Sequence, residues 1–160
     1  MSSSLHTLQR SSSGILTRDA VLLGLACGLL HALVALWAYA SIRPGSFGEV
    51  FSPEQAAGAL LLAAACLGLV VLGAVPAVLL YRRGLVAPVV TLIVLFSWSF
   101  YRSWQSFAAA SEVGATPGVT LRPDSVYVMF WVLPLAIVLV AALAEHLVRG
   151  SSRRSEDARA

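Results

Sequence analysis

Apolar positions along the chain fall into four long blocks, separated by short segments rich in proline, glycine and charge. The blocks extend over about residues 20–42, 54–81, 85–107 and 125–148. At a rise of about 1.5 Å per residue, a helix of this length crosses a hydrocarbon core of about 30 Å. The blocks lack the period-two alternation of membrane-barrel strands, so helices are the favoured structure. The pattern predicts an all-α fold: a bundle of four transmembrane helices.

Turn-forming residues set the expected ends of these helices. We expect a transmembrane domain at 19–149 with helices at about 19–42, 54–82, 85–107 and 125–149. Ser52 has the character of an N-cap, and Pro53 follows at the first position of the second helix. The polar segment 1–18 and the charged segment 150–160 offer little apolar surface to bury, so we expect disordered tails there.

The distribution of charge predicts an orientation. Of the 160 residues, 58% are hydrophobic and 12% are charged, and all 11 basic residues are arginines. Most of them fall on the side that holds both termini: Arg10, Arg18, Arg82, Arg83, Arg149, Arg153, Arg154 and Arg159. The loops on the other side hold Arg43 and Arg122, with Arg102 close by. Because basic residues concentrate in cytoplasmic segments, we expect both termini in the cytoplasm.

Composition also bears on location and partners. The lack of lysine and the abundance of Ala, Gly, Val and Leu are typical of a G+C-rich prokaryote, so we expect residence in its plasma membrane. No basic stripe is interleaved with aromatic residues, which argues against nucleic-acid binding. An alternative for the first helix is a signal peptide, because Ala38-Tyr39-Ala40 resembles a cleavage site. Its apolar block exceeds the core of a cleaved signal, so we favour retention and leave cleavage open.

The first helix carries a small residue at every fourth position. The stripe consists of Ala20, Gly24, Gly28 and Ala32. Small residues on one face let two helix backbones approach closely, which drives association inside a membrane. We therefore predict a packing face here, either against another helix of the chain or against another protein. The alternative is chance, because alanine and glycine are common in this sequence.

One ionisable side chain lies near the middle of a predicted helix. Counted from Ala20, His31 lies about 16 Å deep, near the midplane. Cys27 shares its face, and Cys66 falls at a similar depth on the second helix. Imidazole and thiolate ligands suit zinc or copper, so Cys27, His31 and Cys66 form a candidate metal or redox site. The interpretation that we favour is packing by the cysteines and one hydrogen bond from His31 inside the bundle.

The outer end of the third helix is the most polar membrane stretch. At helical spacing, one face carries Trp98, Tyr101, Arg102 and Gln105. This face is a candidate outward vestibule for an anionic or lipid-like ligand. The alternative, which we favour, is an interfacial anchor in which Arg102 reaches the headgroups. Near the other end of the bundle, Glu145 and Arg149 are spaced for an ion pair at a solvated interface.

The chain carries no recognisable catalytic motif. It lacks a nucleophile motif, a phosphate-binding glycine loop and paired intramembrane carboxylates, so we lean against an enzyme and expect no cofactor. His146 lies about half a bilayer from His31, which disfavours a haem held by both. We expect a structural or accessory subunit that associates with a membrane protein or with copies of itself. The alternatives are a small oligomeric transporter or channel, and a metal or redox protein.

Overall fold

The computed structural model describes residues 3–42, 56–112 and 122–157. These residues form five helices and no strand. The helices are α1 (Ser3–Ile42), α3 (Ala56–Arg83), α4 (Ala87–Glu112), α5 (Pro123–Met129) and α6 (Val132–Asp157). The all-α prediction is therefore confirmed. The predicted helix start at Ser52 and Pro53 lies outside the described residues.

Three of the described helices are long and apolar enough to cross a membrane. These spans are Arg18–Ile42 of α1, Gly58–Arg83 of α3 and Val132–Ser151 of α6. α4 is also long, but its second half carries many serines together with Tyr101, Arg102 and Gln105, which lower its hydropathy. The structure thus supports three membrane-crossing helices, and the fourth span stays a prediction.

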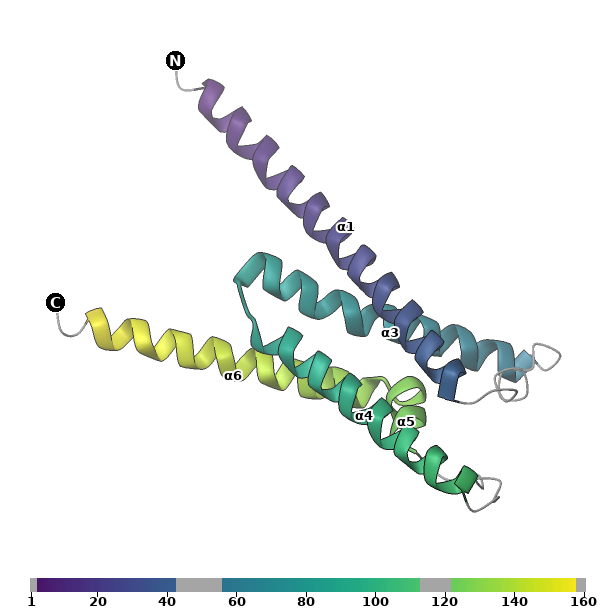
Figure 1. The fold of residues 1–160 in the computed structure, drawn as a ribbon. Helices are drawn as coiled ribbons and strands as arrows, with labels where there is room; N and C mark the ends of the chain where they lie inside the picture. Colours follow the sequence, from purple (N-terminus) through teal and green to yellow (C-terminus); the bar gives the residue numbers. More distant parts are fainter. Residues whose placement is uncertain (1–2, 43–55, 113–121, 158–160) are drawn as a thin grey trace.

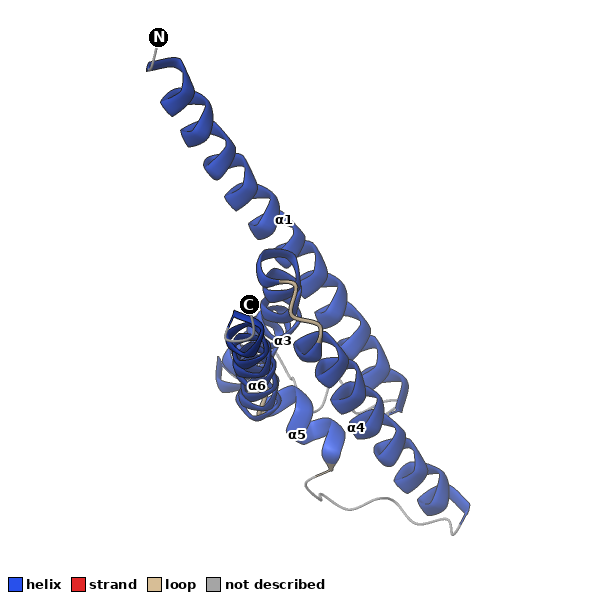
Figure 2. Cartoon of the chain, turned by 90° about the vertical axis from the view of Figure 1, so that its left-hand side faces the viewer, coloured by secondary structure: helices blue, strands red, loops and turns tan. Residues whose placement is uncertain are grey.

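The helices pack as two pairs (Figure 1). α1 lies across α3 in the most extensive contact of the fold, and α4 packs along α6. The short α5 contacts α4, α3 and α1, and α3 also contacts α4 and α6, so the two pairs are joined. The N-terminal half of α1 extends away from the other helices in both views (Figures 1 and 2). The core therefore lies where the second half of α1 meets α3 and α5.

Apolar side chains fill this core, and further apolar side chains cover the outside of the helices. The most completely buried apolar residues of the core cluster are Ala35, Tyr39, Leu69, Leu72, Val128 and Val138. Leu33 of α1 and Val140 of α6 are by contrast 68% and 66% exposed. A soluble domain rarely exposes such continuous apolar surface, whereas lipid covers it at no cost.

The first and last helices extend beyond the predicted spans into both terminal segments, while the division into tails and transmembrane domain stays a prediction. α1 begins at Ser3 instead of 19, and α6 continues to Asp157 instead of ending at 149. No proline interrupts the chain before Ile42 or after Pro134, so the membrane helices meet no strong stop signal and continue. α4 likewise extends past the predicted end at 107 to Glu112.

The predicted fourth helix is divided into two. α5 ends at Met129, a turn follows at Phe130, and α6 begins at Val132. Pro134 explains the break, because proline has no N–H to donate to the carbonyl four residues earlier and its ring crowds that carbonyl. The Phe130 carbonyl instead accepts from the Leu133 N–H at 2.9 Å. The break lets α5 leave the axis of α6 and approach α1.

Candidate functional site

His31 faces the interior of the bundle. His31 of α1 is half-buried, and its Nε2 lies 3.0 Å from the hydroxyl of Tyr127 on α5. Tyr127 is 2% exposed. One of these groups donates and the other accepts, according to the tautomer of the imidazole. The contact joins α1 to α5, two helices that are distant in sequence.

Aromatic rings surround this hydrogen bond. Phe96 of α4 lies edge-on to His31, with ring centroids 5.7 Å apart, and edge-on to Tyr127 at 5.8 Å. Phe100, one turn further along α4, lies 4.6 Å from Phe96 and 5.9 Å from Tyr127. Edge-to-face pairs of this kind contribute about 0.5–1.5 kcal/mol each beyond burial. The aromatic rings of α4 thus pack against the side chains of His31 and Tyr127.

The proposed metal ligands are not gathered into one site. Among the described residues, which include Cys27, His31 and Cys66, no three His, Cys, Asp or Glu side chains are placed to hold a metal ion. Both cysteines are free and half-buried. The Cys27 carbonyl instead faces Gly73 of α3, where an added Cβ would lie 3.1 Å from it. This part of α1 is a surface for backbone packing.

The small-residue stripe of α1 lies against α3 of the same chain. All four members, Ala20, Gly24, Gly28 and Ala32, are buried. A Cβ added to Gly24 would lie 2.7 Å from Cγ2 of Val78, and one added to Gly28 would overlap the carbonyl oxygen of Val70. Gly73 complements them from α3, since its added Cβ would lie 2.5 Å from the Cβ of His31. Close backbone approach therefore places His31 beside α3.

A second buried polar contact joins α4 to α5. The Ser103 hydroxyl donates to Oδ1 of Asp124 at 2.8 Å, and the Asp124 backbone N–H donates back to Ser103 Oγ at 3.1 Å. Both residues are fully buried. Sequence reasoning missed this pair because 21 positions separate the two residues and neither local segment specifies the other. The sequence feature that could have indicated a buried polar contact was Ser103, which lies one turn from Ser99 on the inner face of α4.

The proposed vestibule residues point away from the bundle. Trp98 is 57% exposed and Tyr101 is 63% exposed, and both Arg102 and Gln105 are exposed. Gln105 Nε2 donates to the Tyr101 hydroxyl at 2.9 Å along the helix surface. Trp98 borders an apolar groove of about 370 Å³ between α4 and the α5–α6 break, which Pro134 also lines. The exposure of the four side chains agrees with the interfacial anchor favoured from the sequence, which stays a prediction.

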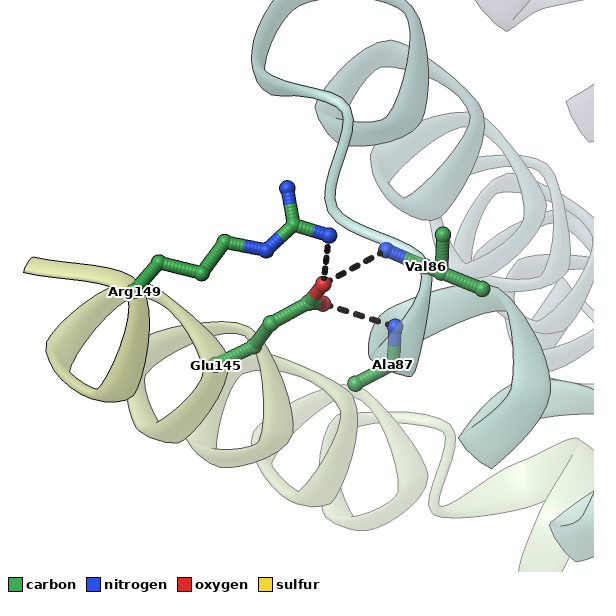
Figure 3. Close-up of polar contacts among 4 residues, drawn as sticks. All are labelled: Val86, Ala87, Glu145 and Arg149. Atoms are coloured by element: carbon green, nitrogen blue, oxygen red, sulfur yellow. Dashed lines mark hydrogen bonds and ion pairs between the residues drawn. The ribbon is translucent and has the colours of Figure 1, made fainter. Parts of the chain in front are cut away.

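At the opposite end of α4, a side chain from α6 binds the start of the helix (Figure 3). Glu145 accepts from the backbone N–H groups of Val86 at 3.2 Å and Ala87 at 2.7 Å. These amides have no partner within their own helix, so the carboxylate satisfies them and also favours the positive end of the helix dipole. Arg149 pairs with the same carboxylate, as its spacing predicted.

The fold and these contacts define the general class of the protein but do not assign it to a family. The chain is an all-helical protein with three helices able to cross a membrane, and its described interior polar groups connect helices. No protein family, no curated protein and no solved structure gives a significant match to the chain. The function must therefore be argued from the contacts alone.

Proposed function

We propose that the chain is a structural or accessory subunit of a membrane complex in the plasma membrane of a prokaryote. In this proposal α4 is the fourth span, both termini are cytoplasmic, and the partner is another membrane protein or a second copy of the chain. The arginine distribution supports the topology, because Arg82, Arg83 and Arg149 lie at one end and Arg122 at the other.

One observation carries the proposal: polar side chains in the interior and at one end of the bundle hold helices together. His31 bonds Tyr127, Ser103 bonds Asp124, and Glu145 binds the start of α4. A transporter exposes such groups to a water-filled path, and a metal enzyme gathers them around an ion. The hollow beside Tyr127 is apolar and opens between helices, which suits lipid better than a polar solute.

Crosslinking in native membranes tests whether a partner is present. Single cysteines would replace Leu33 on α1, Val140 on α6 or Leu60 on α3, side chains that are 68%, 66% and 73% exposed. The background would be a Cys27→Ala, Cys66→Ala chain. We expect at least one position to give a discrete larger species with a bifunctional maleimide, and native mass spectrometry in mild detergent to show the same complex. A chain that remains monomeric in both measurements would contradict the proposal.

A second candidate function is transport by an oligomer. Asp124, Tyr127 and His31 favour it, because these polar residues follow one another from one end of α5 toward the middle of α1. Purified protein in liposomes with an enclosed pH-sensitive dye would test proton movement. If the chain transports protons, the native protein should show proton flux, and Asp124→Asn and His31→Phe should each abolish that flux while the protein stays correctly folded. Equal proton leak through the native and variant proteins would exclude transport as the function.

A further inference from the structure

A basic groove lies between α6 and the turn that joins α3 to α4. It has a volume of about 300 Å³ and is lined by Arg83, Leu85, His146, Arg149 and Gly150. The spans of α3 and α6 end at Arg83 and Ser151, beside this groove. A groove at the ends of two spans lies at the level of the lipid headgroups. The residues that line it are thus presented to phosphate groups in the bilayer.

The groove is built on an ordered turn. Gly84 has φ of 63°, a left-handed conformation that glycine adopts without strain, and its N–H donates to the Leu80 carbonyl at 2.8 Å. Leu85, the next residue, is 3% exposed and anchors the turn in the bundle. Arg83 is therefore attached to a fixed corner and does not extend from a free loop.

Glu145 positions the second arginine. Its carboxylate accepts from the Val86 and Ala87 amides and pairs with an Nη atom of Arg149 (Figure 3). The other Nη atom lies beside Gly84, 3.8 Å from where a Cβ on that glycine would be. The Arg149 side chain is 48% exposed, so its guanidinium borders the groove while one edge is held. An oriented guanidinium matches the paired oxygens of a phosphate.

We propose that this groove binds the phosphate of an anionic phospholipid headgroup. Arg83 and Arg149 provide guanidinium donors, and His146 adds a ring nitrogen as a further donor. Glu145 pairs with Arg149 and accepts from two backbone amides, so Arg83 supplies the net positive charge and Arg149 supplies an oriented donor. Basic pockets between membrane helices are well suited to anionic headgroups, and each arginine near the bilayer surface strengthens such binding by about fivefold. The exposed apolar side chains Val86 and Val90 continue from the turn along α4 and suit the acyl chains.

Binding of short-chain phosphatidylglycerol to the purified full chain, followed by native mass spectrometry, tests the proposal. We expect phosphatidylglycerol to bind and phosphatidylcholine of equal chain length to bind at least tenfold more weakly. Arg83→Gln and Arg149→Gln should each weaken phosphatidylglycerol binding about fivefold. Arg82→Gln is the matched control: it removes the same charge from the adjacent residue, which does not line the groove, and should change binding less than twofold.

Glu145→Gln separates an oriented site from a general attraction between charges. Loss of the carboxylate releases Arg149, so an oriented site predicts weaker phosphatidylglycerol binding although the net positive charge increases. Tighter binding by Glu145→Gln, or equal effects of Arg82→Gln and Arg83→Gln, would overturn the proposal. Glycerol 3-phosphate should fail to displace the lipid at equal concentration. Its displacement of the lipid would assign the groove to a soluble phosphate ester and contradict a lipid site.

Discussion

The two halves of the molecule are held together in different ways. α1 and α3 meet through glycines, and their backbones approach so closely that a Cβ on Gly28 would overlap the Val70 carbonyl. α4, α5 and α6 meet through side-chain hydrogen bonds, such as Ser103 to Asp124 and Glu145 to the start of α4. The packing of α1 on α3 depends on how closely their surfaces fit, and the packing of α4, α5 and α6 depends on hydrogen bonds between side chains and their partners.

This difference follows from the chemistry of a bilayer. Lipid chains are as apolar as leucine, so burying an apolar helix face against another helix gives little hydrophobic gain. Association then requires either dense contact or hydrogen bonds. His31 lies at the junction of the two halves: its Cβ faces Gly73 of α3, while its ring reaches Tyr127 of α5. The comparison predicts that the two halves respond to different kinds of substitution.

The largest effect is expected from a bulky side chain between α1 and α3. Gly28→Leu should destabilise the fold by about 3 kcal/mol, because the Val70 carbonyl belongs to the backbone of α3 and the helices must separate. Unfolding in mixed micelles would measure it. Ala26→Leu, at an exposed position of the same helix, should change stability by less than about 0.5 kcal/mol. Equal stability of the two variants would show that α1 does not pack on α3 through this stripe.

A somewhat smaller effect is expected where α3 meets the α5–α6 break. An added Cβ on Gly68 would overlap the indole ring of Trp131, so Gly68→Ala should cost about 2 kcal/mol. Gly150→Ala is the matched control, because no atom lies within 4 Å of its added Cβ. That control should be neutral or slightly stabilising, as alanine favours the helix. Identical unfolding curves for the two alanine variants would place Trp131 elsewhere.

The polar half should respond to loss of a hydroxyl. Ser103→Ala removes two hydrogen bonds to Asp124 and should cost about 1.5 kcal/mol. Ser106→Ala removes a hydroxyl that bonds only the Arg102 carbonyl of its own helix at an exposed position, and it should cost less than about 0.5 kcal/mol. The difference between their unfolding free energies is the measurement. No difference would mean that the Ser103–Asp124 contact contributes little to holding α4 and α5.

The helices were predictable from the sequence where they depend on the local pattern of apolar and polar residues. The apolar blocks predicted helices, but the last one was expected to be continuous over 125–149, and its division before Pro134 was not predicted. The period-four stripe around Gly28 indicated a face but not its partner, because any helix with a matching glycine would serve. Ser103 and Asp124 were not paired in advance, since 21 positions separate them and nothing local in either segment specifies the other. The Glu145 contact with the start of α4 depends in the same way on the tertiary fold.

The most direct test of the account is a double-mutant cycle between His31 and Tyr127, because the proposed function depends on interior polar groups that join helices. The cycle would compare the native chain with His31→Phe, Tyr127→Phe and the double variant by unfolding in mixed micelles. We predict a favourable coupling of about 1 kcal/mol, in the upper part of the range for hydrogen bonds between membrane helices. Additive effects of the two substitutions, with no coupling, would contradict the account.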